Sequence, residues 1–184
     1  MTPDMLDDLH MWIRSHFFGK YRGTVTDNND TTSRGRLKVT VPAVLETLEV
    51  WAMPCVPYAG NAVGFLSIPA AGAGVWVEFE GGDPSFPIWV GCFWADNEAP
   101  EQANPDVKTW KSEKLVVRLD DAGAELKTAA DDGASLTITS DAVTEAGETK
   151  HTVSPSGVVG EAGAHKTELT AASFSVNSGA LEVI

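Results

Sequence analysis

Three carboxylates, Glu78, Glu80 and Asp83, lie close together in the sequence and are the first candidates for chemistry. Two carboxylates can hydrolyse a glycosidic bond when they lie about 5 to 9 Å apart in a cleft. The intervening residues, EGGDPSF at 80–86, combine Gly, Asp and Pro and predict a tight reversal of the chain. An exposed hairpin provides no cleft, so no catalytic role is expected for these carboxylates.

The other groups able to do chemistry are scattered: His10, His16, His151 and His165, with Cys55 and Cys92. Copies of one histidine from several chains could meet on a shared axis and bind a metal, but the sequence favours surface or turn histidines. Both cysteines lie in apolar contexts and are expected to be buried free thiols, a disulfide being the alternative. Their spacing does not suggest zinc. With no phosphate loop or Ser-His-Asp spacing, we expect no catalytic residue, metal or cofactor.

The carboxylates belong to a stretch, 64–94, that contains three of the six tryptophans. Its first apolar run, 75–79, alternates between two faces, the period of a β-strand, and a second run follows at 87–94. We therefore predict a β-hairpin whose aromatic core is Trp76, Phe79, Trp89 and Phe93.

The residues before this hairpin predict further short strands at 21–27, 36–41 and 49–56, separated by polar turns and prolines. About five short strands in roughly 75 residues suit a small closed barrel, which we place at 19–97. Residues 3–18 predict a helix, with Thr2 as a cap and Pro3 in the first turn. Its apolar stripe includes Leu9, Trp12, Ile13 and Phe17, which either pack on the same domain or dock on a larger partner.

The second half has a different composition. A polar linker at 98–113 is followed by 114–184, where short β-prone runs alternate with Asp-, Gly- and Ser-rich turns about every ten residues. After Trp110 the only aromatic residue is Phe174. One copy of this segment has too few large apolar groups to offset the entropy of ordering, about 1 to 2 kcal/mol per residue. Several copies wound around a shared axis would supply the missing burial, whereas the alternative is a disordered tail.

The formal net charge is −13, which disfavours nucleic acid as a partner because its phosphates would be repelled. No apolar run approaches the roughly 18 residues of a membrane span. Acidic residues precede the first apolar ones, unlike a secretory signal, so synthesis and folding in the cytoplasm are expected.

Several segments together resemble a known family: YRGTVTD at 21–27, GRLKVTVP at 35–42, GFLSIP at 64–69, GVWVEFEGGDP at 74–84 and PIWVG at 87–91. In order and spacing they are similar to the phage baseplate assembly protein V and VgrG-type spike proteins of contractile injection systems. The resemblance covers about 18–97, and a weaker one continues over 111–141, where Ser112-Glu113 replaces the family's Ser-Gly.

The resemblance implies an all-β protein: an oligonucleotide/oligosaccharide-binding (OB) barrel with a short leading helix, followed by an intertwined trimeric β-helix or β-prism needle. It implies a homotrimer that belongs to a phage tail or injection particle and contacts the target membrane transiently as it pierces the envelope. A hub or baseplate protein would bind the base, through Leu9, Trp12, Ile13 and Phe17. A PAAR-type tip protein would cover the apolar end formed by Leu181, Val183 and Ile184.

Some family members hold iron at the needle tip through a His-x-His pair, which this sequence lacks. Two other functions were weighed. A single-stranded nucleic-acid-binding OB protein is opposed by the net charge and by the absence of a visible basic, aromatic groove. An enzyme acting on cell-wall sugars is opposed by the roughly 20 residues available between barrel and needle.

Overall fold

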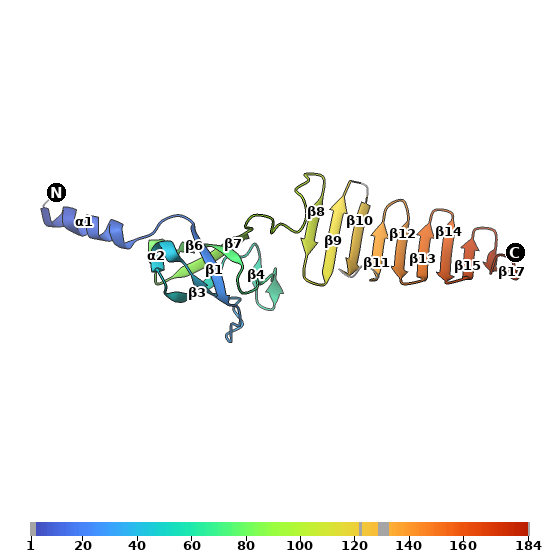
Figure 1. The fold of residues 1–184 in the computed structure, drawn as a ribbon, viewed down its shortest axis with the longest axis horizontal. Coiled ribbons are helices and arrows are strands. Elements are labelled where there is room, and N and C mark those ends of the chain that lie inside the picture. The colour runs from blue at the N-terminus through green and yellow to red at the C-terminus, as the bar shows by residue number, and fades with distance from the viewer. Residues whose placement is uncertain (1–2, 122, 129–132, 184) are drawn as a thin grey trace. The chain divides into compact units, whose positions relative to one another are not determined.

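The computed structural model describes residues 3–121, 123–128 and 133–183, and it divides into two compact units, Met1–Glu98 and Ala99–Ile184. The first unit contains α1 (Pro3–Ser15), β1 (Tyr21–Asp27), β2 (Leu37–Thr40), α2 (Pro42–Leu45), β3 (Glu49–Pro54), β4 (Ala59–Gly60), β5 (Val63–Gly64), β6 (Gly74–Phe79), the 3-10 turn η1 (Glu80–Gly82) and β7 (Pro87–Phe93). Figure 1 shows these elements in the blue to green part of the ribbon.

Five strands of the first unit close into a barrel in the order β1-β2-β3-β7-β6. All pairs are antiparallel except β3 with β7. Because strand residues alternate between faces, one residue in two points inward, and the inward set is Val, Leu, Ala, Phe and Trp. The buried core consists of Val25, Leu37, Val39, Val41, Ala52, Val75, Val77, Phe79 and Trp89. The predicted barrel and its closing hairpin are thus confirmed.

Three local features differ from the sequence prediction. The helix α1 ends at Ser15 and not at residue 18, and the predicted cap Thr2 lies outside the described residues. Pro42 begins the short helix α2 after β2. The two-residue strands β4 and β5, which the sequence did not predict, pair with each other between β3 and β6.

The second unit is one antiparallel sheet of β8 (Lys108–Lys111), β9 (Leu115–Asp120), β10 (Gly123–Thr128), β11 (Ser135–Ile138), β12 (Ala142–Ala146), β13 (Thr149–Ser154), β14 (Gly157–Ala162), β15 (His165–Thr170), β16 (Phe174–Val176) and β17 (Leu181–Val183). Each strand pairs with the strands before and after it in the chain. Figure 1 shows this succession from β8 to β17. The strands of the expected needle therefore find their hydrogen-bond partners within one chain. Residues 108–111, expected in the linker, form the first strand.

The two faces of this sheet differ in chemistry. Directly opposed residues share a face, so the pairings place Leu119, Ala124, Ile138, Ala142 and Val153 in one continuous row. On that face, from β9 to β16, no described residue is Asp, Glu, Lys or Arg. We call it the apolar face, and the other the charged face.

Candidate functional site

The three hairpin carboxylates have different surroundings in the structure. Glu78 is paired with Lys20, and Glu80 is exposed. The Asp83 side chain accepts a hydrogen bond from the Ser85 backbone N–H at 2.9 Å, closing the turn. Hydrogen bonds from Ser85 lower the pKa of Asp83, and the nearby His16 contributes in the same direction. Glu78 and Asp83 thus take part in an ion pair and in a turn, and Glu80 lies at the surface.

The cysteines lie at the surface and are unpaired, so the predicted burial is wrong. Cys55 directly follows β3, and Cys92 lies near the end of β7, where the barrel core no longer covers the strand. Within the described ranges, no group of three or more His, Cys, Asp or Glu side chains from this one chain could hold a metal ion.

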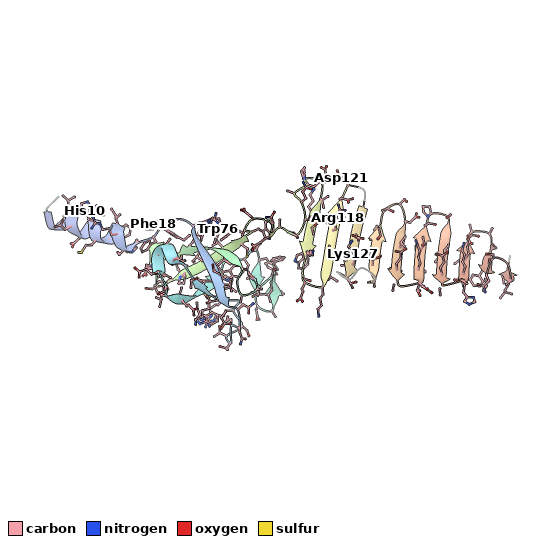
Figure 2. All side chains as sticks on the ribbon, in the orientation of Figure 1. His10, Phe18, Trp76, Arg118, Asp121 and Lys127 are labelled. Atoms are coloured by element: carbon pink, nitrogen blue, oxygen red, sulfur yellow. The ribbon has the colours of Figure 1, made fainter. Side chains whose placement is uncertain are left out.

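The four aromatic residues predicted as the hairpin core lie in two environments. Phe79 and Trp89 are in the buried cluster, and the Trp89 indole N–H donates to the Gly35 carbonyl at 3.1 Å. Trp76 and Phe93 are half-buried on the outer side of the strands, with ring centres 5.1 Å apart. The Arg22 guanidinium lies 5.0 Å from the Trp76 ring centre and 4.6 Å from that of Phe93. Figure 2 labels Trp76 on the barrel.

The four residues predicted to dock a hub also lie in two environments, three on α1 and one against the barrel. Leu9, Trp12 and Ile13 lie on α1 with 44%, 48% and 53% of their surface exposed. Phe17 lies beyond the helix and packs on the barrel, against Tyr21 and Phe79 with ring centres 6.2 Å away. The exposed apolar set on α1 also includes Met5, Leu6 and Met11, which the prediction did not name as docking residues.

The segment after α1 is fixed to the hairpin turn. The Phe17 N–H donates to the Gly82 carbonyl at 2.7 Å. Gly82 has φ +83°, and a Cβ there would lie 2.8 Å from the Phe18 ring and 3.2 Å from the His16 Cβ. Phe18, labelled in Figure 2, therefore covers a position that only glycine can fill without displacement.

Hydrogen bonds to Asp30 hold the polar loop between β1 and β2 in place. The Asp30 carboxylate accepts hydrogen bonds from the Arg34 backbone at 2.9 Å and from Arg36 Nη2 at 2.8 Å. The Arg36 guanidinium lies 5.2 Å from the Trp51 ring centre. Hydrogen bonds from Arg36 hold the pKa of Asp30 far below its usual range.

A groove on the barrel surface has a volume of about 460 Å³. Apolar side chains dominate its lining, including Pro54, Tyr58, Phe65, Ile68 and Trp89, and Arg34 is its one charged residue. A binding groove for a nucleic-acid strand requires several cations along its length, and this groove does not have them.

The apolar face of the sheet leaves many large hydrophobic side chains exposed. In the described part of Ala99–Ile184 no residue is fully buried. All of its exposed large hydrophobic side chains lie on the apolar face: Trp110, Leu115, Leu119, Leu126, Ile138, Val153, Leu169, Phe174, Leu181 and Val183. The last two are the predicted tip residues, and the third, Ile184, lies outside the described residues.

The charged face carries its own neutralising pairs. Lys127 pairs with Glu125 at 3.0 Å and Lys166 with Glu168 at 3.1 Å, in each case within one strand. Arg118 is paired with Asp120 on β9, and Lys150 of β13 reaches Glu145 of β12 at 2.8 Å. The hydrogen bond to Glu145 raises the pKa of Lys150. Figure 2 labels Arg118 and Lys127 on the neighbouring strands β9 and β10. With these ion pairs, the charged face can remain exposed to water.

The first unit can be compared with known families now that its geometry is described. Residues 21–94 match the family model of the type VI secretion system/phage-baseplate injector OB domain. The match runs from the first residue of β1 to one residue beyond β7, so the barrel of this chain is an injector OB domain. A comparison with curated proteins finds no match. The resemblance noted in the sequence is confirmed over the barrel. In this chain the injector OB domain is followed by the sheet with one apolar face and one charged face.

No helix among the described residues is long and apolar enough to cross a bilayer. The injector family indicates a structural component of a virion tail or injection particle, associated with other parts of that machine.

Proposed function

We propose that this protein is the central spike of a contractile injection apparatus, and that it acts as a homotrimer. The observation that carries the proposal is the uncovered apolar face of the sheet that follows the injector OB domain. Water-exposed Leu, Ile and Phe side chains each forgo about 1.5 to 3 kcal/mol of burial energy. A face of ten strands has to be covered, and two further copies of the same sheet have the matching chemistry.

Three sheets with their apolar faces inward would form a triangular prism. Each chain would supply one side of it, because consecutive strands already pair within a chain. The charged face, with its paired Lys, Arg, Asp and Glu side chains, would then be the outer surface. This arrangement keeps the prism of the family resemblance, but it joins complete sheets where the resemblance implied intertwined chains.

Such a prism is suited to mechanical work. Strand hydrogen bonds would run along its length, from one strand to the next, and would resist compression together with the shared apolar core. A contracting sheath would push the spike through the target envelope, with transient membrane contact. Catalysis is not required for this task, and we propose that the protein is not an enzyme.

Two further partners follow from surfaces described above. We propose that the exposed stripe Leu9, Trp12 and Ile13 of α1 docks on a hub or baseplate protein. We propose that β17, with Leu181 and Val183 58% exposed, receives a PAAR-type tip protein. Among the described residues β17 pairs with β16 alone, so its other edge has free backbone groups for a partner.

The decisive experiment is the mass of the full chain in solution, by light scattering or analytical ultracentrifugation. The proposal predicts three times the 19.5 kDa of one chain. A folded monomer or a dimer would overturn it. The alternative, single-stranded nucleic-acid binding, predicts retention of an oligonucleotide at low salt. We expect none, because Lys20, Arg36 and Lys38 are engaged in ion pairs on a strongly acidic protein.

A further inference from the structure

The middle of the apolar face contains a polar interruption. In strands with three residues on this face, the central one is Val117 in β9, Leu126 in β10, Thr144 in β12, His151 in β13, Gly160 in β14 and Thr167 in β15. The pairings put these residues in one row across the sheet, with Leu136 of β11 between Leu126 and Thr144. The row thus changes from aliphatic to small and polar over four adjacent strands, and continues with Val176 and Leu181.

His151 is the one residue of this polar stretch that can bind a metal. Its direct neighbours across the strands are Thr144 and Gly160, and Thr149 and Val153 flank it on β13. No carboxylate on this face is available to hydrogen-bond the imidazole or to neutralise it. His151 is exposed in the single chain, and once the face is covered its imidazole nitrogens need ligands or hydrogen-bond partners within the covered core.

In a threefold prism, the copies of His151 would be those partners. The strand β13 has six residues. Six residues span about 20 Å, and the middle of a 20 Å side lies about 6 Å from the centre of an equilateral triangle. An imidazole reaches about 4.5 Å from its Cα to Nε2, and zinc lies about 2.0 to 2.1 Å beyond a coordinating nitrogen. The imidazole reach and the zinc–nitrogen distance add up to about 6.5 Å, close to the distance of about 6 Å from the middle of the strand to the axis. Three imidazoles would therefore converge on a single ion at the axis.

The next layer leaves room for a fourth ligand. Gly160 has no side chain, and a Cβ placed there would meet only the Thr167 hydroxyl, at 2.9 Å. Three such glycines leave space on the axis beside the three imidazoles, lined by three threonine hydroxyls that can hydrogen-bond to a water. Three histidines with one water is a four-coordinate arrangement that Zn²⁺ adopts in proteins.

We propose that the trimer binds one divalent ion of the zinc class on its axis, through His151 of each of the three chains. This inference rests on the proposed trimeric spike. The ion links the three sheets at the point where their shared core is interrupted by polar residues. It thereby compensates for the apolar contacts that Thr144, Gly160 and Thr167 do not make.

The test uses the untagged full chain, incubated with ZnCl₂, desalted, and measured for bound zinc and for mass. CoCl₂ in a parallel sample gives visible absorption bands that report tetrahedral coordination. We expect one ion per three chains, visible cobalt bands, and a lower melting temperature after EDTA treatment. His151→Ala is expected to abolish all three effects while the protein stays trimeric.

His165→Ala is the matched control. His165 lies on the same face but at the outer end of β15, opposite Ala162, and should be too far from the axis to contribute. The variant is expected to bind zinc like the original protein. A trimer that binds no ion, binds one ion per chain, or retains the ion in His151→Ala would overturn the inference and leave the spike intact. A monomer would overturn both proposals. His151→Gln, which keeps a polar side chain, covers the case in which the alanine variant fails to fold.

Discussion

Asp30 organises the loop between β1 and β2 through charge. Its pKa is held far below the unfolded value by Arg36, so ionised Asp30 stabilises the folded barrel. That contribution is fully present above the unfolded carboxyl pKa of about 3.9 and declines as pH falls below it toward the lower folded-state pKa.

Asp30→Asn should therefore lower the melting temperature of the barrel at pH 7, and the difference from the original protein should shrink from pH 4 to pH 2. Thermal unfolding followed by near-ultraviolet circular dichroism at several pH values measures this. Asp96→Asn, at an exposed position, is the control and should change little. A difference that stays constant down to pH 2 would contradict the account.

A substitution at Gly82 tests how the segment after α1 is attached to the hairpin turn. Gly82→Ala places a Cβ 2.8 Å from the Phe18 ring at a backbone φ of +83°. We expect a loss of about 1 to 3 kcal/mol in unfolding free energy and faster proteolysis around residues 16–18. Gly81→Ala is the matched control: its φ is +60°, but its Cβ meets no atom within 4 Å. It should cost about 1 kcal/mol and leave the proteolysis rate unchanged. Equal effects of the two variants would argue against the contact with Phe18.

At the scale of elements, adjacent residues of β11 lie on opposite faces of the sheet. Leu136 lies on the apolar face and its neighbour Thr137 on the charged face. Leu136→Lys would bury a charge in the proposed core, at a cost of several kcal/mol per chain, and should yield monomers or aggregates. Thr137→Lys adds the same charge outside and should remain trimeric. Size-exclusion chromatography with light scattering distinguishes the two, and a trimeric Leu136→Lys would refute the inward orientation of the apolar face.

The helix α1 can be tested separately from the fold, because Leu9 and Ile13 lie exposed on its surface. Leu9→Ser with Ile13→Ser should leave the unfolding free energy within about 0.5 kcal/mol, since both side chains are exposed. If the proposed hub docking is right, co-purification with the hub protein of the same injection apparatus should be lost. His10→Ser on the same helix is the control and should preserve it. Retained hub binding in the double variant would exclude this stripe as the docking surface.

Elements were predictable from the sequence where the local pattern was strong. Alternation over 75–79 and turn residues over 80–86 determined the hairpin, because each signal depends on adjacent residues only. The pair β4–β5 has two residues per strand, too few for a period to be visible. The polar row of the sheet could not be predicted either. Thr144, His151, Gly160 and Thr167 are separated by seven, nine and seven positions, and only the turn lengths between strands bring them into line.

At the scale of the whole molecule, the two units differ in self-sufficiency. The barrel has a complete core of nine buried residues, whereas no described residue of the second unit is fully buried. A fragment of residues 1–98 should therefore be a folded monomer, with cooperative thermal unfolding. A fragment of residues 99–184 should fold only as it assembles, so its circular dichroism signal should depend on protein concentration. A stable, monomeric second fragment would show that its apolar face needs no cover.

The consecutive pairing of β8 to β17 has a consequence for how the particle is made. Since every strand finds its neighbours next to it in the chain, loop closures are short and a sheet can form soon after synthesis. In the proposed trimer, three finished sheets would then meet by diffusion, and no chain would have to be threaded around another. At equilibrium the concentration of the proposed trimer would rise with the third power of the concentration of free chains, so dilute chains would stay unassembled.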